Sequence, residues 1–171
     1  MGVEIERKFL AQNDGWRALA EPSRATVIHQ GFLSRDPERV VRVRVETPLQ
    51  GGEVKATLTV KGMGAGASRP EFEYPIPTAD AAQLLELCMP EPVHKVRWRI
   101  DAGGGRTFEI DEFRAPHAGL VVVELELASP EQTFVRPAWL GREVTGDPRY
   151  ANSALSAPGA PTPPGSAPAA R

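Results

Sequence analysis

A chain of 171 residues, 41% hydrophobic and 25% charged, is long enough for one domain with a buried core, and its composition is typical of a soluble globular protein. The formal net charge of -2 lacks the basic surplus of a nucleic-acid-binding protein. Cys88 is the only cysteine, so no intramolecular disulfide can form, and the chain has neither a run of about 18 apolar residues nor a signal-peptide core. We therefore expect a cytoplasmic protein that binds neither nucleic acid nor a membrane, with its oligomeric state, for instance a homodimer, left open.

Segments of alternating apolar and polar residues recur along the chain, separated by Gly, Pro and Asp clusters. This alternation is typical of strands with one buried face. It predicts eight strands, at residues 3–10, 25–34, 39–46, 54–61, 69–76, 93–101, 106–113 and 120–127.

Helix signals are fewer. Thr78 is a candidate cap for a helix that runs to Cys88, and the sequence at 129–132, Ser-Pro-Glu-Gln, is typical of a second helix start. A short helical turn is predicted at 150–155. Residues 156–171 are rich in Ala, Pro and Gly and cannot bury enough apolar surface to fold, so we expect one domain over 1–155 and a disordered tail.

The charged residues of the predicted strands share one face, and apolar residues occupy the other, on seven of the eight strands. Two folds produce this pattern. In a β-sandwich the apolar faces pack together and the charges contact water. In a closed antiparallel barrel with a charged lumen, the apolar exterior is covered by helices and loops. A membrane barrel has the same polarity, but short strands, intervening helices and sparse aromatic residues argue against it.

The order of the charges favours the charged lumen. Acids and bases come as same-sign doublets, whereas an ordinary solvated face mixes the two signs because like neighbours repel. Glu4, Glu6 and Lys8 lie on one face of the first strand. Two carboxylates can hold a hard divalent cation, and an ammonium beside them can take an anionic oxygen that the cation also polarises.

The motifs that carry a family resemblance follow in order along the chain. They are Val-Glu-Ile-Glu-Arg-Lys-Phe-Leu at 3–10, Gln30-Gly31-Phe32-Leu33, Arg42-Val43-Arg44, Leu58-Thr59-Val60-Lys61, Glu71-Phe72-Glu73, Lys95-Val96-Arg97, Phe108-Glu109-Ile110-Asp111, Glu124-Leu125-Glu126 and Arg149-Tyr150-Ala151-Asn152. Over about residues 1–155 the chain resembles the CYTH-type triphosphate tunnel metalloenzymes. Among them it is most similar to small bacterial inorganic triphosphatases.

The resemblance implies an eight-stranded antiparallel closed barrel, with flanking helices outside, that binds a triphosphate together with Mg²⁺ or Mn²⁺. It implies metal ligands at five carboxylates: Glu4, Glu6, Asp111, Glu124 and Glu126. It implies phosphate ligands at seven cations: Lys8, Arg42, Arg44, Lys61, Lys95, Arg97 and Arg149. Lys61 and Lys8 are the candidate catalytic residues. Crowded cations favour the neutral form of a lysine, so Lys61 can act as a general base.

The implied reaction is metal-dependent hydrolysis of inorganic tripolyphosphate to pyrophosphate and phosphate, by in-line attack of water. Two alternatives stay open. The first is a reaction of an organic triphosphate, either hydrolysis of thiamine or nucleoside triphosphate or cyclisation of ATP. The second is a non-catalytic polyphosphate-binding module. Some relatives have a tyrosine where this chain has Phe32, so the activating group would be metal-bound water or Lys61 alone. Glu71 and Glu73 are interpreted as partners of Lys and Arg, and Arg99 as part of a solvated strand end.

Overall fold

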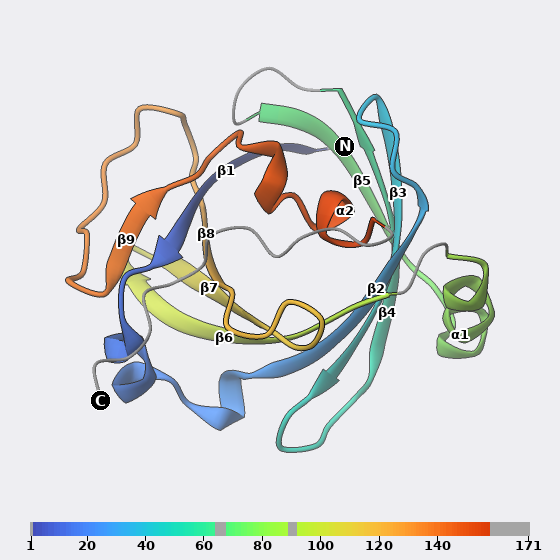
Figure 1. Ribbon diagram of the computed structural model, residues 1–171, viewed down its shortest axis with the longest axis horizontal. Helices are drawn as coiled ribbons and strands as arrows, with labels where there is room; N and C mark the ends of the chain where they lie inside the picture. Colours follow the sequence, from blue (N-terminus) through green and yellow to red (C-terminus); the bar gives the residue numbers. More distant parts are fainter. Residues whose placement is uncertain (1, 64–67, 89–91, 158–171) are drawn as a thin grey trace.

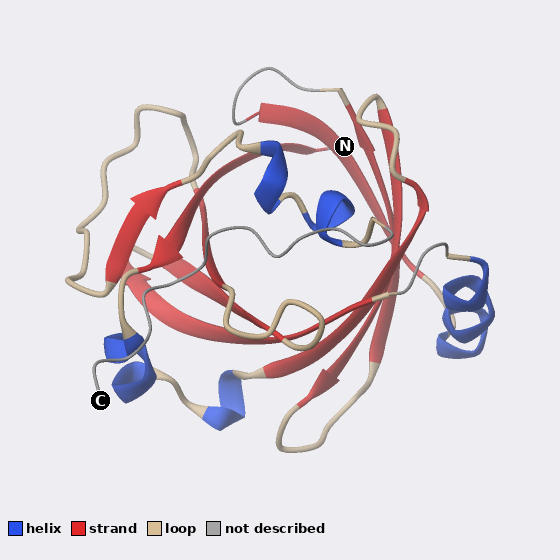
Figure 2. Ribbon diagram, viewed as in Figure 1, coloured by secondary structure: helices blue, strands red, loops and turns tan. Residues whose placement is uncertain are grey.

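The computed structural model describes residues 2–63, 68–88 and 92–157, which form one antiparallel sheet with few helices (Figures 1 and 2). All eight predicted strands are present, each within two residues of its predicted bounds. A ninth strand was not predicted. The strands are β1 (Gly2–Ala11), β2 (Thr26–Ser34), β3 (Arg39–Pro48), β4 (Lys55–Gly62), β5 (Ser68–Pro75), β6 (Val93–Gly103), β7 (Arg106–Phe113), β8 (Val121–Glu126) and β9 (Leu140–Glu143).

The nine strands pair in the order β5-β4-β3-β2-β6-β7-β8-β1-β9. β5, at one end of this order, also pairs with β1, over the registers Gly2↔Glu71 to Ile5↔Ser68. Figure 1 shows the strands curving around a common centre. The prediction of a mainly β antiparallel fold is therefore confirmed. The additional strand β9 pairs with β1.

The helices correct one prediction and refine two. The predicted helix after Thr78 is α1 (Thr78–Leu87), and the predicted turn at 150–155 is the 3-10 helix η3 (Pro148–Tyr150) followed by α2 (Asn152–Leu155). The helix predicted to start at 129–132 is wrong: this segment forms a single turn, and the chain then runs without regular structure up to β9. β-branched residues and Pro137 follow, and both disfavour a helix. Two further 3-10 helices, η1 (Asp14–Leu19) and η2 (Pro22–Arg24), precede β2.

α1 packs outside the sheet and covers the apolar face of β3 and β4 (Figure 1). Ala81 and Leu85 contact a cluster that includes Val43 and Ala56. The end of the helix lies close to β2, where a Cβ on Gly31 would come within 2.6 Å of the Cβ of Cys88. Gly31 therefore permits the approach of α1 to the sheet.

A larger apolar cluster covers the outer face of β1, β7 and β8. It includes Phe9, Trp16, Phe108 and Trp139, and Phe134 from the irregular segment packs against it. A third cluster lies on the opposite face, where Leu10, Phe113 and Val122 meet Tyr150 and Leu155 from η3 and α2. Apolar side chains thus lie mainly outside the sheet, with one patch on the inner face.

α2 departs from the expectation that the helices flank the outside. It lies within the curve of the strands in Figure 1, and Lys95 Nζ donates a hydrogen bond to Asn152 Oδ1 at 3.2 Å. Ser156 is buried, although the predicted tail begins there, while 158–171 lie outside the described residues. Within the described part of the chain, no helix has the length and apolar content needed to cross a membrane.

Candidate active site

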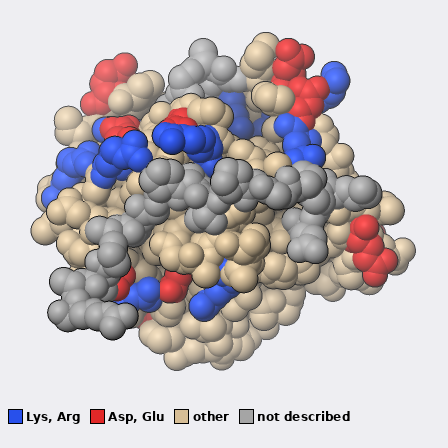
Figure 3. Space-filling model, in the orientation of Figure 1, with Lys and Arg blue, Asp and Glu red and all other residues tan. Residues whose placement is uncertain are grey.

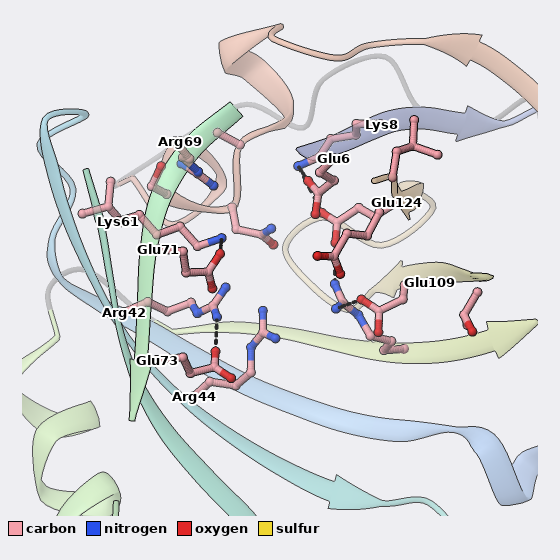
Figure 4. Close-up of a pocket in the computed structure, with 18 of the residues that line it drawn as sticks. Glu6, Lys8, Arg42, Arg44, Lys61, Arg69, Glu71, Glu73, Glu109 and Glu124 are labelled. Atoms are coloured by element: carbon pink, nitrogen blue, oxygen red, sulfur yellow. Dashed lines mark hydrogen bonds and ion pairs between the residues drawn. The ribbon is translucent and has the colours of Figure 1, made fainter. Parts of the chain in front are cut away.

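The inner face of the sheet encloses a cavity of about 750 Å³ lined mainly by charged side chains (Figure 4). The outer surface differs: on the face shown in Figure 3, acidic and basic side chains are interspersed among uncharged residues. Parity along each strand explains the lining, because every second residue points to the same side. The predicted site residues that line the cavity are Glu6, Lys8, Arg42, Arg44, Lys61, Arg97, Glu124 and Glu126.

One wall of the cavity comes from β1 and β8 and is mainly acidic. Glu6 lies opposite Glu126 and Lys8 lies opposite Glu124 in the strand register. Lys8 Nζ is 3.0 Å from Glu124 and 3.6 Å from Glu6. Burial alone would lower the pKa of Lys8, but these carboxylates raise it above its ordinary value. Lys8 is therefore held as an ammonium at the edge of the acidic wall.

Beneath this wall, Arg97 of β6 joins three carboxylates. Its guanidinium donates two parallel hydrogen bonds of 2.7 Å to Asp111, a third of 2.6 Å to Glu124 and a fourth to Glu109. Burial works against the charged form of Asp111, but Arg97 and Lys95 outweigh it and hold the pKa of Asp111 below its usual value. Paired charges of this kind, with several hydrogen bonds, fix the orientation of Arg97.

Lys95 lies deeper than Arg97, with its ammonium against Asp111 and Asn152. It is fully buried and does not line the cavity. Burial, together with Arg97 and Arg44, lowers the pKa of Lys95 to about 8 despite the neighbouring Asp111. Lys95 and Asp111 thus lie behind the residues that line the cavity, where Asp111 contacts both Lys95 and Arg97.

The opposite wall comes from β3, β4 and β5 and is mainly basic. Lys61 Nζ is 2.9 Å from Glu71, its cross-strand partner. Arg42 Nη2 is 3.0 Å from Thr59 and 3.3 Å from Glu73. The two glutamates hold cationic side chains toward the cavity, as interpreted from the sequence, and Figure 4 shows this wall facing Lys8, Glu6 and Glu124.

Besides Lys95 and Asp111, two further predicted residues are not placed in the cavity. Arg149 is exposed and pairs with Asp147, two residues before it, so the prediction that it lines the site is not supported. The side chain of Glu4 lies outside the described part of the structure, although its backbone pairs with Arg69.

The cavity also contains residues that were not predicted as site residues: Arg69, Arg99, Arg106, Glu109 and Asn152. Arg99, interpreted as a solvated end, donates to Glu109 at 3.1 Å and to Thr26 at 2.6 Å. The signal for Arg69, Arg99 and Glu109 was present in the sequence, because each lies two residues from a predicted site residue or from Glu71 on the same strand face.

Phe32 lines the cavity, as its position after Gln-Gly implies, and it pairs with Arg42 in the register of β2 and β3. Only 5% of its surface is exposed. Phe32 contributes a ring and no hydroxyl to the basic wall.

The carboxylates of the cavity are oxygen donors of the kind that a divalent metal ion binds. Among the described residues, no three His, Cys, Asp or Glu side chains are arranged to hold a metal ion, and Asp111 is turned toward Lys95 and Arg97. The chemistry of Glu6 and Glu126 nevertheless fits a hard cation, because like charges directly opposite each other repel unless a cation lies between them. Glu126 has no ion-pair partner among the side chains that the structure describes.

Comparisons with known proteins identify relatives of this chain. A family model for the CYTH domain matches residues 2–151. An inorganic triphosphatase from Acetivibrio thermocellus is 43% identical, with 91% of this chain and 94% of the relative covered. An inorganic triphosphatase from Nitrosomonas europaea is 35% identical, with 90% and 97% covered. The crystal structure of an inorganic triphosphatase is similar with a TM-score of 0.60 and 31% identity, over 91% of this chain and 95% of that one.

Proposed function

The chain belongs to the CYTH domain family, and from this premise we propose that it is an enzyme that hydrolyses inorganic tripolyphosphate to pyrophosphate and phosphate. The observation that carries the proposal is the cavity whose opposite walls are acidic and basic (Figure 4). A triphosphate carries several negative charges along a short chain, so it matches a wall of cations better than a neutral substrate does.

We infer that β1 to β8 form a closed tunnel around this cavity. The pairing of β5 with β1 supports it, because it returns the strand order to a strand already in the sheet. The burial of the charged lining supports a closed tunnel as well. On an open sheet the charged face would be in contact with water, whereas Arg42, Lys61 and Arg97 are buried.

Arginines suit phosphate recognition, because a guanidinium can donate two parallel hydrogen bonds to one phosphate group. Six of the described arginines line the cavity, among them the predicted phosphate ligands Arg42, Arg44 and Arg97. Lys8 and Lys61 act as point charges. Lys61 forms an ion pair with Glu71, and this contact favours a role in binding phosphate over a role as general base.

We assign Glu6, Glu124 and Glu126, together with Glu4, which precedes Glu6 by two residues on β1, as the carboxylates that hold Mg²⁺ or Mn²⁺. Such an ion, when bound, neutralises phosphate charge and lowers the pKa of bound water. Lys8, between Glu6 and Glu124, places an ammonium where the metal side meets the phosphate side. The protein residues thus position substrate and water for in-line attack, and no covalent nucleophile is required.

A substrate panel tests the proposed function. The purified protein is incubated with Mg²⁺ or Mn²⁺ and, separately, tripolyphosphate, ATP and thiamine triphosphate, and phosphate and cyclic AMP are measured. We expect phosphate mainly from tripolyphosphate and none after chelation of the metal. Cyclic AMP, or phosphate mainly from an organic triphosphate, would contradict this substrate. Binding without turnover in either metal would instead indicate a polyphosphate-binding module.

Glu126→Gln tests the metal assignment. The substitution keeps the shape of the side chain and removes one oxygen ligand, so we expect metal-dependent turnover to fall by more than about 10-fold. The matched control is Glu86→Gln on the exposed face of α1, which should retain full activity. Wild-type turnover in Glu126→Gln would show that this carboxylate does not act with the metal.

A further inference from the structure

Arg44 differs from the other buried cations that line the cavity in how its charge is balanced, and the less buried Arg106 donates to the backbone carbonyls of Gly103 and Thr133. Arg42, Lys61, Lys8, Arg97 and Arg99 each have a carboxylate oxygen within 3.3 Å. The carboxylate nearest to Arg44 among the described residues is that of Glu46, at 3.6 Å. Burial, with the neighbouring charges of Arg42 and Arg97, lowers the pKa of Arg44 to about 9. Arg44 remains a cation at neutral pH, with less compensation than its neighbours.

The side chain of Gln30 makes a closer polar contact with Arg44 than Glu46 does. It lies directly opposite Arg44 in the register of β2 and β3, and its Oε1 accepts a hydrogen bond of 2.9 Å from Arg44 Nε. Its side chain is fully buried and its Nε2 has no hydrogen-bond partner among the described residues. The reverse orientation of the amide would place a donor against a donor, so the contact with Arg44 fixes the orientation that leaves Nε2 unpaired.

A glutamate at position 30 would serve stability better than this glutamine. Its two oxygens could accept from the same guanidinium, and no buried donor would be left unpaired. It would also neutralise Arg44. A neutral amide fixes the direction of the guanidinium and leaves its charge in the cavity, where Figure 4 shows Arg44 pointing toward the space between the two walls. Stability given up at a site in this way is typical of functional residues.

We propose that Gln30 is a positioning residue that orients Arg44 without neutralising it, so that Arg44 is the principal anchor for a phosphate group of the substrate. The inference rests on the proposed function, because it assigns the anion to the triphosphate of that site. The inference predicts that a negative charge added next to Arg44 lowers the affinity for triphosphate. A negative charge removed from that position should raise the affinity.

Gln30→Glu and Glu46→Gln test this in opposite directions. Tripolyphosphate binding is measured by calorimetry without divalent metal and at fixed ionic strength, because salt screens these charges. We expect Gln30→Glu to raise Kd at least about 10-fold while the melting temperature stays the same or rises. Glu46→Gln removes the remaining nearby carboxylate and should lower Kd about 2- to 5-fold. Gln83→Glu, on the exposed face of α1, adds the same charge at a distance and should leave Kd unchanged.

Gln30→Met separates orientation from charge. It keeps the bulk of the side chain and loses the acceptor, so we expect KM to rise more than kcat falls. Unchanged Kd in Gln30→Glu and in Glu46→Gln would overturn the inference while leaving the proposed function intact. If Gln30→Glu does not fold, the test rests on Glu46→Gln. A Kd of this variant equal to or higher than that of the wild-type protein would then overturn the inference. A wild-type protein that binds no tripolyphosphate would overturn the proposed function and, with it, this inference.

Discussion

Arg69 and Arg149 illustrate how the position of a side chain decides its role. Arg149 belongs to one of the family motifs and Arg69 lies two residues before another, but only Arg69 lines the cavity, from β5 and beside Lys61 and Glu71 in Figure 4. Arg149 lies in a 3-10 helix with its guanidinium held by Asp147. The contrast supplies a matched pair of substitutions.

We expect Arg69→Ala to weaken tripolyphosphate binding, because a charge-assisted hydrogen bond contributes about 1.5–3 kcal/mol. This corresponds to a rise in KM of roughly 10- to 100-fold. Arg149→Ala, which removes an equal charge outside the cavity, should change KM less than about 2-fold. Steady-state kinetics of the two variants under identical salt gives the comparison. Equal effects of the two substitutions would mean that overall charge, and not position, governs binding.

At this scale the sequence predicted which face of each strand is ionic, since side-chain parity follows from the strand itself. It did not predict that Asp111 faces Lys95 and Arg97, because those contacts depend on the distance between β6 and β7 side chains. It also did not predict the location of Arg149, which depends on the path of the chain after β9.

At the scale of elements, β2 and β6 carry an unusual pair on the face opposite Lys95. His29 and His94 lie directly across from each other, with ring centroids 4.3 Å apart and nearly parallel. Partial burial, with His94 nearby, lowers the pKa of His29 below 6.5. The folded protein therefore favours the neutral form of His29 more than the unfolded chain does.

This preference predicts a pH dependence of stability. Between pH 6.5 and the lower folded pKa, the unfolded chain binds more protons at His29 than the folded protein does. The contribution of His29 is therefore fully present above pH 6.5 and is lost as the pH falls toward the folded pKa. We expect His29→Gln to flatten the decline in the free energy of unfolding between about pH 7 and pH 5. Urea denaturation of wild type and variant across this range measures it, and parallel curves would contradict it.

Strand prediction succeeded and helix prediction partly failed for a physical reason. Eight strands have long alternation and clear Gly or Pro boundaries, whereas β9 has four residues, too few for a period to be seen. β9 is held by its pairing with β1 and by Arg7, which donates hydrogen bonds of 2.9 Å and 2.5 Å to Glu143. At 129–132 the start signal is present, but the β-branched Thr133 and Val135 and then Pro137 follow and disfavour a helix.

At the scale of the whole molecule, the cavity collects side chains from strands throughout the chain, so a ligand in it holds together elements that are distant in sequence. A ligand that binds the folded state alone stabilises it by about 2.7 kcal/mol at 100 times its Kd. For a chain of this size we expect a rise in melting temperature of roughly 5–10 °C with tripolyphosphate.

The stabilisation should weaken as salt increases, because the cavity charges are partly screened. Sulfate at equal ionic strength is the control and should give a much smaller rise. Differential scanning calorimetry provides the measurement. If sulfate and tripolyphosphate raised the melting temperature equally, the cavity would have no preference for a linear polyanion.

The pairing of β1 has a consequence for how the protein folds. β1 contacts β5, β8 and β9, and its Arg7 bonds to a residue 136 positions later in the chain. Such distant pairings carry a large loop-closure entropy, and sheets dominated by them fold on the slow scale of milliseconds to seconds. Until β1 docks, β8 has an open edge and the acidic wall lacks Glu6 and Lys8. The site is therefore complete only when these long-range pairings of β1 have formed, and a locally folded segment of the chain cannot hold it.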